Sequence, residues 1–274
     1  MENTVRIIFV SLLLLAGCKQ QNQVNPRLDD EMPKKILWAW ERPEDLRFID
    51  EREYGVAFLA QTIFLENDRV MPRGRKQPLQ TRPGTYLIAV TRVETNKDGG
   101  KRPAFDDEMV NKTAALIRNT IELPDVRGIQ VDFDAVVSER DFYRKMMKEL
   151  RRLLSEPPAS AGGQNANDTH RSPFTTHRSL TMTALASWCT GDAWFNDFPV
   201  DEAVPMVFQM GADSEKIKTY LRNGNDWTEP LCRASYGISL DEAKFEGIKP
   251  GRRMYYFKNS AWNAGDLSGT NLER

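Results

Sequence analysis

Two aspartates at alternating positions close an apolar stretch of the chain. The stretch is GIQVDFDA, residues 128–135, and its acids are Asp132 and Asp134. Alternate side chains of a β-strand share a face, so both carboxyls point the same way as Gln130. Carboxylates held close together in a buried place push one pKa upward, which keeps a proton available for general acid catalysis. A half-exposed antiparallel strand with its polar face in water is the simpler alternative.

The elements around this stretch decide between the two interpretations. Eight strand-like runs occur in the chain: ILWAW from residue 36, GVAFLAQTIFL from 55, YLIAVTRVE from 86, GIQVDFDA from 128, LTMTALASW from 180, AVPMVFQM from 203, ASYGISL from 234 and RMYYFKN from 253. Apolar residues at helical spacing predict helices over 105–123, 138–154 and 213–223. Alternating strands and helices favour a parallel sheet, and eight strands in 274 residues predict an α/β fold of the (β/α)8 TIM type.

The barrel is expected to be irregular, because the helices after the first, second, fifth and seventh strands are unclear in the sequence. An open doubly wound sheet is the alternative. In a barrel both faces of a strand are buried, so Ile129, Val131 and Phe133 are expected to pack under the helices. Asp132 and Asp134 then point inward, with Asp134 at the rim where barrel active sites lie. Sugar hydrolysis needs such an acid together with a second carboxylate or an internal nucleophile.

GIQVDFD resembles the fourth-strand motif of the chitinase-type (family eighteen) glycoside hydrolases, in which alternating aspartates lead to a catalytic glutamate. The resemblance implies that Asp134 stands in the place of the glutamate as general acid and that Asp132 supports it. Gln130 replaces a further aspartate of the motif. MVFQ, residues 206–209, is similar to the family's Met-x-Tyr-Asp pattern, with Phe208 and Gln209 in place of the tyrosine and the aspartate.

A second resemblance covers most of the chain. ILWAWERPEDLRFI, GIQVDFDA, LTMTALASWC and DEAVPMVFQMG together resemble a bacterial family of domains of unknown function, numbered 3142, whose fold is similar to glycosidase barrels. This resemblance implies a fold and no particular activity.

Further candidate site residues are charged or aromatic and lie near the ends of predicted strands. Aromatic faces stack on the apolar C–H faces of sugar rings, and a tryptophan that closes the eighth strand resembles the sugar platform of chitinase-like barrels. The substrate-binding candidates are Trp262, Trp188, Gln209, Glu41, Arg92 and Glu94. We expect no cofactor and no metal, although Asp132, Asp134 and a neighbouring acid form an alternative oxygen-ligand site for Ca²⁺ or Mg²⁺.

The leading functional hypothesis is a glycoside-hydrolase-like barrel that acts on an envelope or environmental polysaccharide. The alternative is a non-catalytic barrel that binds a glycan or a protein, since folds are retained when their chemistry is lost. The 38 basic and 39 acidic side chains give a net charge of −1, so no electrostatic argument supports a nucleic-acid partner.

The first residues, MENTVRIIFVSLLLLAGC, predict export. A short start with Arg6, an apolar run and small residues before Cys18 are typical of a signal peptide over 1–17. LAGC resembles the bacterial lipobox, which implies lipidation of Cys18. The charged and amide-rich stretch that follows predicts a flexible tether over 18–34, and the predicted barrel covers 35–274. Lys19 then favours the outer membrane, with the protein in the bacterial cell envelope and facing the periplasm.

Two features depend on this exported setting. Cys189 and Cys232 are an even pair in a compartment where disulfides persist, so a disulfide and two separate buried thiols both stay open. A loop over 156–179, rich in Pro, Gly, Ser and Asn, is predicted to be flexible, and it contains both histidines, His170 and His177.

Overall fold

The computed structural model describes residues 31–97, 100–156, 178–192 and 194–268. The predicted signal peptide, the predicted lipidation site Cys18, most of the tether and the two histidines lie outside these residues. Across the described ranges, none of the helices is long and apolar enough to cross a membrane.

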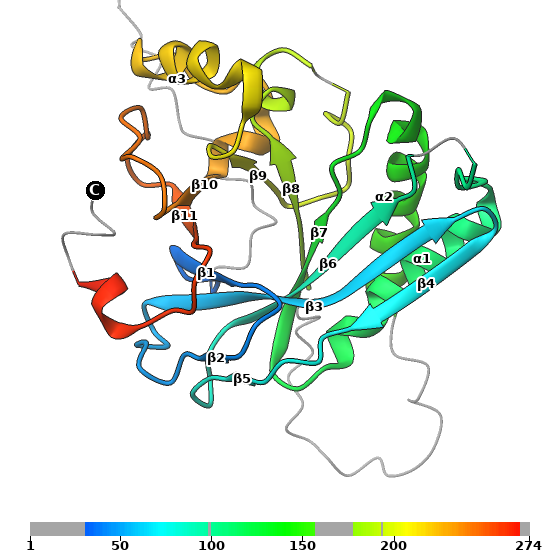
Figure 1. The fold of residues 1–274 in the computed structure, drawn as a ribbon, viewed down its shortest axis with the longest axis horizontal. Helices are drawn as coiled ribbons and strands as arrows, with labels where there is room; N and C mark the ends of the chain where they lie inside the picture. The colour runs from blue at the N-terminus through cyan, green and yellow to red at the C-terminus, as the bar shows by residue number, and fades with distance from the viewer. Residues whose placement is uncertain (1–30, 98–99, 157–177, 193, 269–274) are drawn as a thin grey trace, which may run out of the picture.

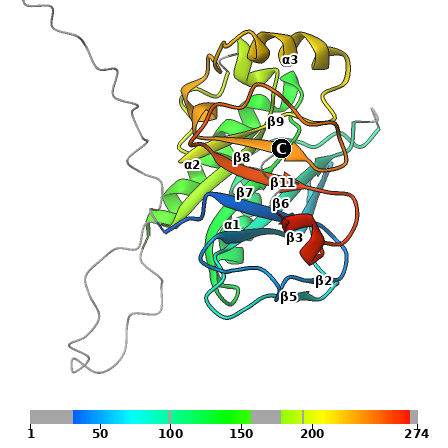
Figure 2. The ribbon, with the colours of Figure 1, turned by 90° about the vertical axis from the view of Figure 1, so that its left-hand side faces the viewer.

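Eight parallel strands close into a barrel (Figures 1 and 2). Neighbours in the barrel follow one another along the chain, and β1 pairs with both β3 and β11, which closes the sheet. The strands are β1 (Lys35–Ala39), β3 (Tyr54–Glu66), β6 (Leu87–Thr95), β7 (Val126–Asp132), β8 (Ser179–Leu185), β9 (Glu202–Met206), β10 (Ser235–Ser239) and β11 (Arg253–Phe257). The predicted (β/α)8 barrel is therefore confirmed, and the open doubly wound sheet is excluded.

The helical layer is irregular, as the sequence predicts. Among the described residues, α-helices follow three barrel strands: α1 (Asp107–Asn119) follows β6, α2 (Arg140–Ser155) follows β7 and α3 (Ser214–Arg222) follows β9. Short 3-10 helices flank these α-helices, follow β8 or follow β11: η1 (Thr120–Glu122), η2 (Val137–Glu139), η3 (Trp188–Thr190), η4 (Gly211–Asp213), η5 (Pro230–Ala234) and η6 (Ala264–Leu267). Figure 1 shows α1 and α2 together beside β6 and β7, with α3 apart from them.

Three further strands lie outside the barrel and were not predicted. β3 continues past the barrel and pairs antiparallel with β4 (Arg69–Gly74), which forms a long hairpin. β2 (Glu44–Asp45) and β5 (Leu79–Gln80) form a separate two-stranded sheet. The hairpin brings Arg75 back to the carboxyl end of β1, where its guanidinium bonds the backbone of the next loop.

The alternation of β7 sorts its side chains as predicted. Ile129, Val131 and Phe133 lie in a buried cluster that includes the inward faces of α1 and α2. Gln130 points the other way and is fully buried, where it accepts a hydrogen bond from Trp38 Nε1 at 2.7 Å and donates one to Thr181 Oγ1 at 3.2 Å. The polar face of this strand therefore lies inside the barrel, not in water.

Cys189 and Cys232 form a disulfide. Cys189 lies in η3 after β8 and Cys232 lies in η5 before β10, and their Cα atoms are 6.0 Å apart. Both side chains are fully buried. Of the two arrangements that the sequence left open, the structure contains the covalent link.

Candidate active site

A cavity of about 280 Å³ opens at the carboxyl ends of the barrel strands. Its lining divides into two parts that come from different strands. The acidic half comprises Arg92 from β6, Asp132 and Asp134 from the end of β7, and Thr183 from β8. The aromatic half comprises Trp38 and Trp40 from β1 and its end, Phe208 after β9, and Phe257 at the end of β11. This is the end of the barrel at which active sites of the fold lie.

Asp132 is the centre of the acidic half. It is the last residue of β7, and only 5% of its surface is exposed. Thr183 Oγ1 donates a hydrogen bond of 2.7 Å to Asp132 Oδ1, and Arg92 Nη1 lies 3.6 Å from Oδ2. Arg92 also donates from Nε to Glu94 Oε1 at 2.8 Å, so its charge is shared between two carboxylates.

Burial, together with the nearby charge of Asp134, raises the pKa of Asp132 from 3.8 to about 6. The Arg92 guanidinium and the Thr183 hydroxyl favour the ionised form and oppose the rise. Asp134 itself is exposed and lies just beyond the strand end. The pair thus combines Asp132, which keeps its proton in mildly acidic solution, with Asp134, which faces the open cavity.

The aromatic half is a continuous set of rings. Phe208 and Phe257 are stacked with centroids 5.3 Å apart and planes 7° from parallel. The edge of Trp40 meets Phe257 at 6.3 Å, and Trp38 meets Phe208 at 6.2 Å. Trp38 is held in place by its hydrogen bond to Gln130.

The sequence provides the space for Trp38 through a glycine. Gly237 lies in β10, and a Cβ atom at this position would come within 2.7 Å of the Trp38 ring. A side chain there would displace the indole, so the close approach of β10 to this ring requires glycine.

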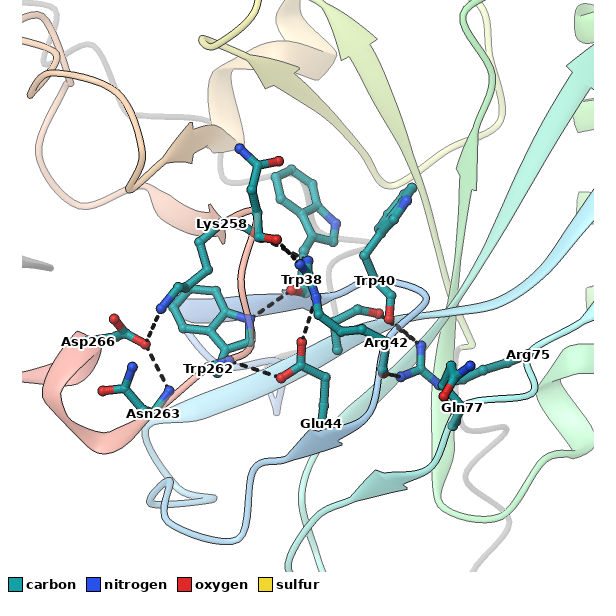
Figure 3. A network of polar contacts seen from close by, with 12 residues as sticks. Trp38, Trp40, Arg42, Glu44, Arg75, Gln77, Lys258, Trp262, Asn263 and Asp266 are labelled. Carbon is teal, nitrogen blue, oxygen red and sulfur yellow. Dashed lines mark hydrogen bonds and ion pairs between the residues drawn. The ribbon is translucent and has the colours of Figure 1, made fainter.

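Polar contacts fix the backbone that follows β1 and carries Trp40 (Figure 3). Arg75 donates to the carbonyl oxygens of Trp40 at 2.6 Å and Arg42 at 2.5 Å. Arg42 in turn donates to Lys258 O at 2.9 Å and pairs with Glu44, with Nε 3.0 Å from Oε1. The loops after β1 and β11 are therefore tied together next to the aromatic half.

Four of the predicted site residues line this cavity: Asp132, Asp134, Arg92 and Gln209. Gln209 has a positive φ of 49°, and its backbone N–H donates to Glu242 Oε1 at 2.8 Å, which fixes the loop after β9. Glu94 does not line the cavity and acts on it through its ion pair with Arg92.

Trp262, predicted as a sugar platform, lies elsewhere. It is 5% exposed and packs in the core, where its Nε1 donates to Trp38 O at 2.9 Å and its backbone N donates to Glu44 Oε2 at 3.0 Å (Figure 3). The chain turns back after β11, so this ring supports β1 and does not present a face to the cavity. The Trp262 ring therefore packs behind Trp38.

Trp188 and Glu41 are also placed away from the cavity lining. Trp188 is 4% exposed and meets Trp194 edge-on at 5.0 Å, next to the disulfide at Cys189. Glu41 pairs with Arg73 of the β3–β4 hairpin at 3.4 Å. Both residues follow strand ends, but neither of them lines the cavity.

Sequence reasoning did not select Thr183 or most of the aromatic half. Thr183 and Thr181 alternate on β8 as Asp132 and Gln130 do on β7, and this shared alternation was the available signal. Phe257 is the last residue of its strand, and Trp40 directly follows its own. Their convergence depends on the pairing of β1 with β11, which closes the barrel.

Within the described ranges, no group of three or more His, Cys, Asp or Glu side chains is arranged to hold a metal ion. Comparison with models of known protein families gave no match. Comparison with curated proteins gave no match either.

Proposed function

We propose that the chain is a carbohydrate-active barrel of glycoside-hydrolase type, with Asp134 as general acid and Asp132 in support. The observation that carries the proposal is the cavity itself, in which a coupled pair of aspartates faces a set of aromatic rings. Stacking on rings and proton donation from a carboxyl are the two requirements of sugar hydrolysis that this lining supports.

The two aspartates suit different parts of this role. Asp134 is exposed to the cavity and can reach a bound ligand. Asp132 is buried and accepts a hydrogen bond from Thr183. It therefore supports the reaction through its proton and its charge, and not only through contact with the sugar.

The test measures how much a protein that comprises residues 19–274 releases reducing ends from a panel of envelope and environmental polysaccharides. Asp134→Asn keeps the shape of the side chain and removes the acid, so we expect a loss of about 10²-fold or more in kcat/KM. Glu122→Gln is the matched control, because Glu122 is exposed and precedes β7 at the opposite end of that strand. Equal activity of Asp134→Asn and the parent would contradict the assignment.

A second candidate function is glycan binding without hydrolysis. It is favoured by the wall that Met206, Phe208 and Gln209 form, which is apolar or amide in character. In a binding protein of this kind, a bound glycan would quench or enhance the tryptophan fluorescence. The protein would release no reducing ends from that glycan. Detection of products from any bound glycan would exclude this second candidate.

We further propose that the protein is anchored in the bacterial cell envelope through a lipid on Cys18. The support is the sequence LAGC after an apolar run, together with the charged and amide-rich stretch that follows it. A Cys18→Ser variant is expected to leave the membrane fraction of cells that express it. Full retention of that variant in the membrane fraction would contradict the anchor.

A further inference from the structure

The charges that line the cavity do not balance. Its charged lining residues, among those that the structure describes, are Arg92, Asp132 and Asp134. Arg92 is already engaged by Glu94 at 2.8 Å and lies 3.6 Å from Asp132. The Asp134 carboxylate accepts no hydrogen bond from any described residue, and the nearby Lys97 Nζ lies 3.4 Å from its backbone oxygen. The cavity therefore presents an uncompensated negative charge at Asp134.

The opposite wall also favours a cation. Trp40, Phe208 and Phe257 are partly exposed and line the cavity next to one another. The faces of aromatic rings carry negative electrostatic potential and attract ammonium groups as well as the C–H faces of sugars. A ligand that joins an apolar ring face to a positive charge would satisfy both halves at once.

We propose that the cavity selects an amino sugar whose amine is free and protonated. The ring would stack on the aromatic half and the ammonium group would bind Asp134 in its ionised form, while the same carboxyl acts as general acid in those complexes in which it carries the proton. This inference rests on the proposed function, since it names the class of sugar that the same cavity takes.

The chemistry of the other common substituents explains the expected selectivity. An N-acetyl group carries no charge, and its amide N–H can donate one neutral hydrogen bond to Asp134. A hydroxyl can also donate one hydrogen bond to Asp134, and both are weaker than a charge-assisted bond from an ammonium group. The amine is therefore expected to bind most tightly, ahead of both the hydroxyl and the N-acetyl group.

The test uses three β-1,4-linked tetrasaccharides that differ only at carbon 2: those of glucosamine, glucose and N-acetylglucosamine. Binding to residues 19–274 is followed by calorimetry and by tryptophan fluorescence at pH 6.5. We expect the glucosamine tetramer to bind about tenfold more tightly than the glucose tetramer, which corresponds to about 1.4 kcal/mol. Added salt should reduce this preference, because it screens the ammonium–carboxylate attraction.

Two variants separate charge from stacking. Asp134→Asn should abolish the preference for glucosamine and retain weak binding of the glucose tetramer, whereas the control Glu122→Gln should keep the preference. Trp40→Ala should weaken binding of all three tetramers by a similar factor, because it removes part of the shared stacking surface. Near-ultraviolet circular dichroism of each variant confirms that the protein used is folded.

The possible results have distinct meanings. Equal or tighter binding of the glucose or N-acetylglucosamine tetramer would overturn the amino-sugar inference and leave sugar binding in place. A glucosamine preference that survives Asp134→Asn would also overturn it. Binding of none of the three tetramers would count against carbohydrate binding itself and therefore against the proposed function.

Discussion

The carboxyl group of Asp132 keeps its proton more tightly in the folded protein than in water, because the barrel removes its solvent and places Asp134 nearby. Thr183 and Arg92 are the groups that make its ionised form tolerable. A buried acid of this kind costs stability whenever it is charged. Such a loss of stability at neutral pH is expected of a residue that is placed for function.

Asp132→Asn tests this cost. The pKa of Asp132 is about 6 when folded, against an ordinary value of 3.8, so the folded state binds the proton more tightly. The associated stability is present below about pH 4 and is lost as the pH rises through 6, a difference of about 3 kcal/mol at 1.36 kcal/mol per pKa unit. Urea unfolding of the variant and of the parent is compared at pH 4 and pH 7.5. The free energy of unfolding of the variant, relative to that of the parent, should be higher at pH 7.5 than at pH 4 by about that amount. A constant difference at both values would contradict the burial argument.

At the scale of the elements, strand ends position the site and glycine sets the distance between two of them. Gly237 of β10 lets the Trp38 ring of β1 lie across the barrel interior, where a Cβ atom would be 2.7 Å away. Trp38 in turn is bonded to Gln130 of β7 and lines the cavity. A change on one strand therefore reaches the lining through the packing of another.

Gly237→Ala is expected to lower the free energy of unfolding by about 1–3 kcal/mol, because the added methyl group overpacks a filled interior. It should also weaken binding of any cavity ligand, since the Trp38 ring must move. Gly74→Ala in β4 is the matched control, because a Cβ atom there would meet no atom within 4 Å. Denaturant unfolding measures both variants, and equal effects of the two would contradict the steric argument.

The sequence was informative about elements whose signal is local. All eight barrel strands were predicted, because each is an apolar run that β-alternation or full burial explains. β4 was not predicted, since RVMPRG is polar, contains Pro72 and becomes a strand only by pairing with the long β3. Asp132 and Asp134 of the acidic half were predicted from alternation within one strand, whereas Thr183 was not selected. The aromatic half was not predicted, because its rings meet only through barrel closure, and Trp262 was misplaced because the chain after β11 turns back into the core.

At the scale of the whole molecule, the disulfide links the segment after β8 to the segment before β10. Cys189 and Cys232 are separated by 43 residues, and the segment between them contains β9 and α3. η3 begins directly after Ala186 and Ser187, which line the cavity. The bond therefore restrains one rim of the cavity as well as the segment that contains β9 and α3.

Replacement of both cysteines by alanine is expected to lower the free energy of unfolding by about 4 kcal/mol, the chain-entropy value for a loop of 43 residues. Urea unfolding of the variant and of the parent measures the change. Reduction of the unfolded parent should bring its refolded stability close to that of the variant. A difference under about 1 kcal/mol would show that the link restrains little of the unfolded chain.

Closure of the barrel also depends on the order in which its strands are synthesised. β1 has its place beside β3 early in synthesis, but its other neighbour is β11, and Arg253 of that strand bonds Pro33 from 220 residues along the chain. Until β11 has been made, both β1 and β10 are open edges that can pair with strands of other molecules. A growing chain of this protein is therefore most prone to aggregation after β10 has been made and before β11 has been made.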